Sequence, residues 1–554
     1  MSIQKLFIVL TLTVAAVSCS LKETADGYVT KDNFYKTEEQ CYSALRACYT
    51  PVHYIYNRPF LLATEACTDL YFCNVSAEDG ILAITPARPG AAANVWLYAY
   101  KGVARANECI ACIADSPIED SVKGPMVAEA RALRALYYYI LTSFMGDVPF
   151  YTMPVKDIET MEEIRRLPRT SASEIRSILY DDLKNNALPF FTDENGLRCR
   201  ANEVKNQHAG YALTLMLMAK FAMWNSEWTD ALYALDLLEQ TYGEFSENNF
   251  PLDEIQWRYK NTAESIFEIQ HAWSADGVKF YGQVASVMSP RCSGEWIYDG
   301  VYMPELARTG TNSSPVKLGK HFALYRSANN SKTENSANAQ GIFEALPMTF
   351  SNETYDFSAS AKRYKSIIDL GAIESGVTAN GKALDRRILY KVGMGNLENG
   401  NTFETIKTGG FFYGGPQFWC PAMTATYDSN NYRIFRYADA VLMQAECYCE
   451  LGLSDKAISY LDKTRARAGL APYLYSTDID LMREIQNERA RELGGEFHRK
   501  FDLVRWGIWY DMTRSFNEEP RVVANIRRCH QFYPIPDTEC ALSGGVLTND
   551  AYNE

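Results

Sequence analysis

The chain has 554 residues, of which 47% are hydrophobic and 22% charged, and its formal net charge is −13. This composition is typical of a folded globular protein and excludes a collagen-like or disordered chain. Nucleic-acid binding relies on clustered Lys and Arg that displace counterions from phosphates. The one Arg-rich stretch, 483–505, carries Glu at a similar density, which indicates internal ion pairs rather than a phosphate-binding surface.

The N-terminus has the pattern of an export signal. Lys5 precedes an apolar run, 6–17, that is too short to remain in a bilayer as a spanning helix. Cys19 directly follows this run and resembles the lipidated cysteine of bacterial lipoproteins. We therefore predict a signal peptide over residues 1–18 and a lipid anchor on Cys19, and the alternative is an ordinary signal peptide cut nearby.

Helical periodicity governs the segments that follow. Apolar residues recur at alternating three- and four-residue spacing over 94–114 and again over 126–145, which predicts two helices with one apolar stripe each. The sequence 146–149, Gly-Asp-Val-Pro, predicts the end of the second helix, because proline cannot continue it.

Two later segments, 219–236 and 445–462, resemble each other as helix, tight turn and second helix. Aligned on their alanines, they share the pattern of the tetratricopeptide-type helical hairpin, a unit that stacks in arrays. The matching pairs are Ala219 with Ala445, Ala231 with Ala457, Leu235 with Leu461 and Asp236 with Asp462. We predict a mainly α-helical scaffold over about 30–245 and 430–515.

The segment of about 274–430 differs in composition, since it is rich in Gly, Asn, Ser and Thr and its apolar runs are too short for helices. Long irregular segments inside a compact domain are usually functional. We expect a single domain, 19–554, in which this loop-rich insertion carries the binding face.

A row of glutamates at 484, 488, 492 and 496 lies on one helix face, because the spacing is four residues. A glycosidase would need two carboxyl groups about 5–10 Å apart across a sugar. The alternative, which we favour, is an ion network that clamps the last hairpin, with Arg489, Arg491, Arg499 or Lys500 neutralising the carboxylates.

Motifs for catalysis or metal binding are missing from the sequence. The six His are far apart, and there is no P-loop, no dinucleotide fingerprint and no nucleophile elbow. Cys109 and Cys112 have the spacing of a redox or zinc motif but lie in a helical pattern with no second pair. We expect no enzyme activity, no metal and no cofactor.

The C-terminal third is specific enough for a family resemblance. The segments FRYADAVLM (435–443), ELG (450–452), RARAGL (465–470), ERAREL (488–493), DLVRWG (502–507) and FYPIP (532–536) follow one another in that order. FYKTEE (34–39), Trp96 with Asn107, and ESIFEIQ (264–270) agree with it nearer the front. This succession resembles the SusD/RagB family of outer-membrane nutrient-binding lipoproteins.

The resemblance implies a SusD-like fold with tetratricopeptide-like hairpins, anchored by lipid at the cell surface in the outer membrane. It implies binding of an oligo- or polysaccharide and its delivery to a SusC-like TonB-dependent transporter. The alternatives are a peptide or glycopeptide binder of the RagB type, a scaffold that only holds the transporter together, or a surface glycoside hydrolase.

Binding residues are predicted from chemistry, because the family's ligand residues form no motif. A sugar ring stacks its C–H face on an aromatic ring, while its hydroxyls need positioned polar partners. Two loops, 69–88 and 273–302, supply both, and the alternative for each residue is a packed loop anchor. The predicted ligand-binding residues are Tyr71, Asn74, Arg88, Trp273, Trp296 and Tyr298.

Overall fold

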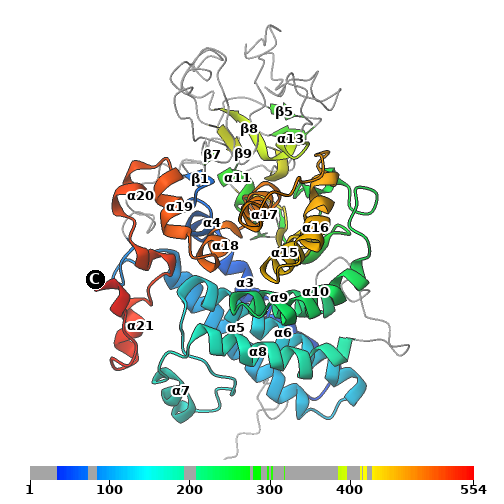
Figure 1. Cartoon of the computed structure of the whole chain (residues 1–554). Coiled ribbons are helices and arrows are strands. Elements are labelled where there is room, and N and C mark those ends of the chain that lie inside the picture. The colour runs from blue at the N-terminus through cyan, green and yellow to red at the C-terminus, as the bar shows by residue number, and fades with distance from the viewer. Residues whose placement is uncertain are drawn as a thin grey trace, which may run out of the picture.

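The computed structural model describes residues 34–72, 84–191, 208–274, 277, 279–288, 296–298, 301–303, 317–318, 385–395, 412–414, 416–418, 420 and 427–553. The signal segment, Cys19 and most of the predicted insertion lie outside these residues. The described part is mainly helical, as predicted (Figure 1). No helix in it is both long and apolar enough to cross a membrane.

The scaffold consists of helix pairs that pack on one another. In Figure 1 the pairs α5–α6 and α9–α10 form the lower part together with α8, and α15–α17 lie above them. Helix α10 contacts α15, and α15 contacts α17, so the two halves of the chain form one continuous body. Their bounds are α5 Ala91–Ala114, α6 Asp120–Met145, α8 Ala172–Asn186, α9 Tyr211–Trp224, α10 Trp228–Tyr242, α15 Tyr437–Glu450, α16 Ser454–Arg467 and α17 Asp478–Leu493.

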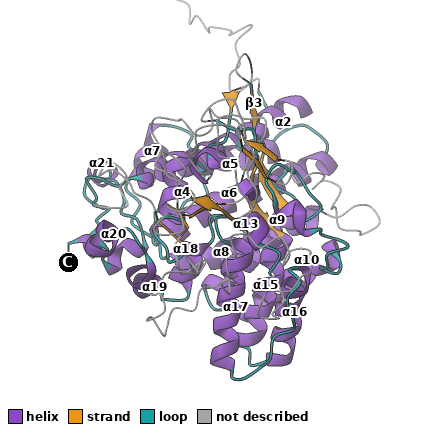
Figure 2. Ribbon diagram, turned by 90° about the horizontal axis from the view of Figure 1, so that it is seen from above, coloured by secondary structure: helices purple, strands orange, loops and turns teal. Residues whose placement is uncertain are grey.

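Shorter helices lie before, between and after the helix pairs along the chain. The C-terminal helices α19–α21 occupy one side of the molecule, and α10 and α16 the other, in both views (Figures 1 and 2). The N-terminal helices are α2 Glu38–Ala47, α3 Thr50–Ile55 and α4 Arg58–Thr64; the others are α7 Ile158–Arg165, α11 Val284–Met288, α13 Ile388–Lys391, α18 Arg499–Arg505, α19 Trp509–Phe516, α20 Pro520–Asn525 and α21 Asp537–Leu542.

The predicted helix pairs are present, but two helices begin earlier than predicted, and α5 starts at Ala91 rather than at residue 94. Each of the segments 219–236 and 445–462 contains the end of one helix, a turn and the start of the next helix. The helices are α9 and α10 in the first segment and α15 and α16 in the second. Helix α6 begins at Asp120, six residues before the predicted start, because Pro125 is accommodated inside its second turn at the loss of one backbone hydrogen bond. The tetratricopeptide type of these pairs stays a prediction.

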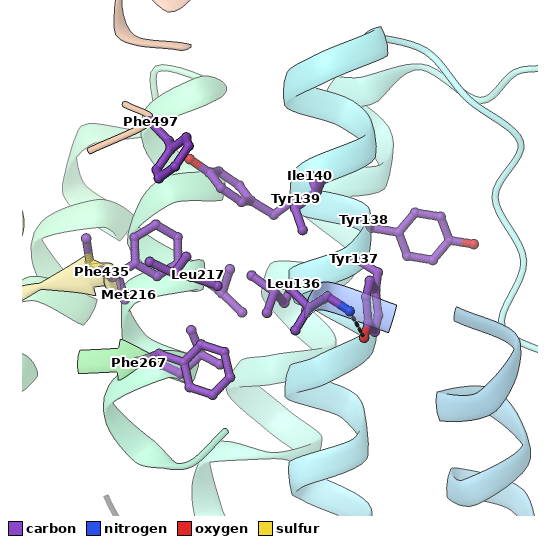
Figure 3. Packing of buried hydrophobic residues seen from close by; sticks show 14 of the residues in the cluster. Leu136, Tyr137, Tyr138, Tyr139, Ile140, Met216, Leu217, Phe267, Phe435 and Phe497 are labelled. Carbon is purple, nitrogen blue, oxygen red and sulfur yellow. Dashed lines mark hydrogen bonds between the residues drawn. The ribbon is translucent and has the colours of Figure 1, made fainter. Parts of the chain in front are cut away.

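The chain contains 36 tyrosines, and three consecutive ones on α6 show how some of them are used (Figure 3). Successive helix residues point about 100° apart, so each of the three rings meets a different neighbour. Tyr137 accepts a hydrogen bond from the Val52 N–H, Tyr138 donates one to the Tyr151 carbonyl, and Tyr139 packs edge-on against Phe435. All three are at most 3% exposed. These rings serve the core.

Strands are short and join distant parts of the chain. Strand β2 (Ser265–Ile269) pairs antiparallel with β10 (Tyr432–Arg436), which leads directly into α15. A four-stranded sheet in the order β1-β7-β9-β8 lies at the top of Figure 1. Its strands are β1 Tyr71–Phe72, β7 Lys317–Leu318, β9 Phe412–Gly414 and β8 Val392–Gly395; β3 Ala272–Trp273 pairs with β4 Lys279–Phe280, and β5 Trp296–Tyr298 with β6 Val301–Met303.

The glutamate row of α17 and the turn after it is part of a buried ion cluster. Glu492 binds Arg387 at 3.0 Å, Arg436 at 2.7 Å and also Arg467, and all four side chains are at most 1% exposed. Although burial raises the pKa of Glu492, the three guanidinium groups hold it well below its usual value. We define the buried ion cluster as Arg387, Lys391, Arg436, Arg467, Asp385, Glu264, Glu488, Glu492 and Glu496.

The predicted ion network is confirmed, but most of its predicted partners were wrong. Arg491 does bind Glu488, at 2.9 Å. Arg489 instead binds Asp439 and Asp502, Arg499 binds Asp69, and Lys500 donates to the His530 carbonyl. Most of the arginines that neutralise the row come from elsewhere in the chain, at residues 387, 436, 465 and 467, which the helical spacing of α17 could not reveal.

Gly495 lies in the turn that follows α17 and has a backbone conformation specific to glycine. Its φ is +85°, in the left-handed region that glycine adopts without strain. A Cβ atom there would lie 2.7 Å from Phe418 and 3.0 Å from the Tyr71 hydroxyl. The backbone therefore needs glycine at this turn.

Candidate functional site

The last turn of α3 places an imidazole and a phenol side by side. Pro51 at the start of this six-residue helix fixes its first turn, and Asn57 begins α4 by accepting a hydrogen bond from the Phe60 N–H. His53 and Tyr54 therefore lie in a tight link between two helices, with ring centroids 5.1 Å apart. Tyr54 is 45% exposed, which is unusual for so large a ring.

Helix α5 supplies a second, partly buried tyrosine. Tyr98 lies off the buried stripe of α5 and stacks on Tyr54, with centroids 4.7 Å apart and planes 21° from parallel. The Asn94 and Asn57 amides both donate to the Tyr54 carbonyl, at 2.6 and 2.9 Å, and so fix the backbone that carries the ring. Lys101 lies 5.1 Å from the centroid of the Tyr98 ring.

A hairpin brings a third aromatic group to the same place. Strand β3 pairs with β4 so that Ala272 faces Phe280. The Phe280 ring stacks on His53, with centroids 3.7 Å apart and planes 20° from parallel.

The next residues pair with a distant segment. Gly282 and Asp428 exchange two backbone hydrogen bonds, of 2.8 and 3.0 Å. This bridge places Tyr281 beside Tyr427, with ring centroids 3.9 Å apart. A Cβ at residue 282 would lie 2.6 Å from the Asp428 Oδ1 atom, so the close approach requires glycine. Burial, followed by the neighbouring Tyr427 hydroxyl, raises the pKa of Tyr281, and Tyr54 also contributes.

We call His53, Tyr54, Tyr98, Phe280, Tyr281 and Tyr427 the aromatic platform. Apart from the exposed Tyr54, all are partly buried. The platform offers flat apolar rings, phenol hydroxyls and an imidazole. Flat apolar rings bordered by hydrogen-bonding groups suit a ligand that is flat and apolar on one face and polar at its edges.

A histidine pair underlies the platform. The His53 Nδ1 atom lies 3.0 Å from the His271 Nε2 atom, and the His271 Nδ1 atom lies 2.8 Å from the Asn430 carbonyl oxygen. Burial lowers the pKa of His53 to about 4 and that of His271 to about 3. Both rings are therefore neutral near pH 7.

The predicted ligand-binding residues lie in several places. Tyr71 is only 1% exposed, under Gly495, so no ligand can stack on its ring in this structure. Arg88 is exposed, in a turn closed by its pairing with Thr85. Asn74 lies outside the described residues. Trp273, Trp296 and Tyr298 lie in β3 and β5, where the description covers the backbone and not these side chains.

The prediction missed the platform's tyrosines on the helices. Phe280 and Tyr281 lie within the second predicted loop, 273–302, but were not singled out. Tyr98 carried a usable signal: it lies two residues after the buried Trp96 and therefore on another face of α5. Tyr54 carried none, because its neighbours in space come from residues 94–98 and 280–281.

Comparison with known proteins agrees with this architecture. Residues 421–552 match the model of the SusD family. The SusD-like protein P25 of Formosa agariphila is 25% identical over 586 aligned positions, which cover 100% of this chain and 99% of the relative. The family model thus matches the C-terminal region, whereas the similarity to the relative covers the whole chain.

Solved structures show the same fold. A SusD homolog from Bacteroides thetaiotaomicron superposes with a TM-score of 0.66 at 16% identity, covering 93% of this chain and 97% of that one. Surface glycan-binding protein A from the same species, solved in complex with laminarihexaose, gives 0.57 at 18% identity, covering 92% and 98%. The protein has a SusD-like fold. The resemblance to the SusD/RagB family predicted from the sequence is confirmed.

Proposed function

We propose that this protein binds an oligo- or polysaccharide at the cell surface and passes it to a SusC-like TonB-dependent transporter. The observation that carries the proposal is the aromatic platform, where five aromatic rings and an imidazole meet at a partly exposed surface. The C–H face of a pyranose ring stacks on such rings, and burial of that face supplies affinity that hydroxyl groups alone cannot, because water competes for them.

The relatives support the ligand class. A structure with the same fold, surface glycan-binding protein A of Bacteroides thetaiotaomicron, holds laminarihexaose. The predicted signal peptide and lipidated Cys19 fit a protein anchored to the outer membrane and facing outward. In this proposal Arg88, Asn74, Trp273, Trp296 and Tyr298 extend the binding surface around the platform.

We infer a binding protein rather than a hydrolase. The glutamates that could be taken for an acid/base pair have a structural role. Glu488, Glu492 and Glu496 are at most 1% exposed and bind arginines or lysine. A carboxyl group so placed cannot reach a glycosidic bond. A peptide ligand of the RagB type is the second candidate, since exposed tyrosines also bind peptides.

Affinity electrophoresis of the protein without residues 1–19, across neutral and acidic polysaccharides, tests the proposal. We expect one polymer to retard the protein without release of sugar. Release of sugar would indicate a hydrolase. No retardation of a folded sample by any polymer would contradict glycan binding and favour a peptide ligand.

A matched pair of variants locates the site. Tyr54→Ala removes an exposed ring of the platform and should abolish most of the retardation. Tyr233→Ala removes a ring of similar exposure, 44%, on α10, and should leave it unchanged. Equal effects of the two variants would place the ligand elsewhere.

A further inference from the structure

The hydrogen bonds of the histidine pair determine where its protons lie. A carbonyl oxygen only accepts, so the His271 Nδ1 atom, 2.8 Å from the Asn430 oxygen, must carry a proton and donate it. In the neutral ring, the His271 Nε2 atom then has a lone pair and accepts. The His53 Nδ1 atom, 3.0 Å away, must therefore be the donor.

The second nitrogen of His53 follows from the same logic. With Nδ1 protonated and the ring neutral, Nε2 carries a lone pair and can only accept a hydrogen bond. Within the described part of the chain no protein group donates to this atom, and it is not one of the buried polar atoms left without a partner. Besides His271, the rings next to His53 are Phe280, Tyr54 and Tyr281, with ring centroids 3.7, 5.1 and 6.4 Å from that of His53.

Charged groups near this nitrogen are few. Among the described residues, the titratable groups facing His53 are His271, Tyr54 and Tyr281. Lys260 binds the His271 backbone carbonyl at 2.8 Å, behind the pair, and Lys101 lies over the Tyr98 ring. Burial alone accounts for the lowered pKa of His53. The described surroundings of the ring supply no cation that would compensate a bound carboxylate.

We propose that the His53 Nε2 atom is a fixed hydrogen-bond acceptor for a ligand hydroxyl, and that it makes the platform selective for uncharged glycans over uronate-containing ones. The proposal rests on the proposed function and adds the ligand's charge class. A Ser or Asn at this place could donate or accept as the ligand required. The imidazole cannot, because the Asn430 carbonyl fixes the whole chain of protons. It pairs with a hydroxyl and repels a carboxylate oxygen.

The protonation states can be measured without a ligand. Long-range 1H–15N correlation spectra of the purified protein labelled with 15N-histidine report which ring nitrogen is protonated. At pH 7 we expect His53 and His271 both neutral with Nδ1 protonated, assigned by the loss of signals in His53→Asn and His271→Asn. A protonated Nε2 on His53, or a cationic ring, would overturn the proposal.

The selectivity is measured by affinity electrophoresis with laminarin and further neutral glucans, galactans and mannans, against alginate and polygalacturonate. We expect retardation by a neutral polymer only. His53→Asn keeps a donor toward His271 but loses the outer acceptor, and should weaken this binding roughly tenfold, the effect of one lost hydrogen bond. His53→Gln restores an oxygen near the Nε2 position and should recover part of it.

His208→Asn serves as the control, because His208 is partly exposed and contacts Glu129, away from the platform. It should bind like the unaltered protein. Retardation by uronates as strong as by neutral polymers, or unchanged binding by His53→Asn, overturns the proposal while glycan binding stands. If no polymer is retained, the proposed function fails and this inference with it, whatever the spectra show.

Discussion

The buried ion cluster and the aromatic platform differ in charge and in exposure to solvent. In the cluster, charged groups are removed from water, and each is compensated by several partners: Arg436 alone binds Glu264, Glu492 and Glu496, each at 2.7 Å. On the platform the rings are neutral near pH 7 and partly exposed. The conspicuous charges are thus structural, and the surface that suits a ligand carries little charge.

The largest expected loss of stability comes from a substitution at the centre of the buried ion cluster. Glu492→Ala would leave Arg387, Arg436 and Arg467 short of a common counter-charge in the interior. Removal of one partner from a buried ion pair costs about 3–5 kcal/mol. We expect a loss of this size in the free energy of unfolding, measured by urea denaturation, and a loss below about 1 kcal/mol would show that the cluster is not essential to stability.

A second prediction concerns Glu65, a buried carboxyl group near the cluster. Its desolvation raises its pKa to about 8, and the Gly495 N–H at 3.3 Å offsets this only in part. Between about pH 4.5 and 8 the folded state holds a proton that the unfolded state releases, so stability falls as pH rises through this range.

Glu65→Gln removes this titration. Relative to the variant, the unaltered protein should lose stability steadily from about pH 4.5 to about 8 and then no further. Melting temperatures of both proteins across this pH range measure the difference. Parallel curves would mean that Glu65 is ionised throughout.

A third prediction disturbs the platform through its backbone. Gly282→Ala would place a Cβ 2.6 Å from the Asp428 Oδ1 atom and separate Tyr281 from Tyr427. Overpacking of this kind costs about 1–3 kcal/mol. We expect a lower melting temperature together with weaker retention by the polysaccharide.

Gly124→Ala is the matched control. The atoms nearest to its Cβ would be those of the Phe190 ring, which is 48% exposed and can rotate away. It should change neither stability nor retention. Normal binding by the Gly282→Ala protein would show that the Tyr281–Tyr427 pair is not part of the binding surface.

The smallest expected effect concerns an ion pair at the surface of α17. Arg483 is 65% exposed and binds Asp480 at 3.0 Å. Exposed pairs contribute about 0–1 kcal/mol, so Arg483→Ala should change the free energy of unfolding by no more than this. A loss comparable to that of Glu492→Ala would remove the distinction between buried and exposed charges on the same helix.

Sequence reasoning predicted what depends on local spacing. The helix pairs at 219–236 and 445–462 are confirmed because a 3.6-residue period is visible within one segment. The structural use of the glutamate row is confirmed for a similar reason, since four-residue spacing determines a helix face. The start of α6 was predicted six residues too late, because its first turns carry few apolar residues of the repeating pattern and the helix accommodates Pro125.

The platform depends on contacts that no local pattern contains. His53 meets His271 across 218 residues, through the β2–β10 pairing and the reversal into β3. Among the predicted ligand-binding residues, Tyr71 is placed in the core by its closeness to Gly495, which no local pattern of residues 69–88 reveals. The roles of Arg88, Asn74, Trp273, Trp296 and Tyr298 stay predictions.

The buried ion cluster also has a consequence for the order in which the chain is made. Arg387, Arg436 and Arg467 are synthesised before Glu488, Glu492 and Glu496, with which they pair. Before α17 is made, these three arginines have only Asp385 and Glu264 as partners within the cluster, too few to compensate three buried charges at acceptable cost. Stable folding must wait until almost the whole chain is available.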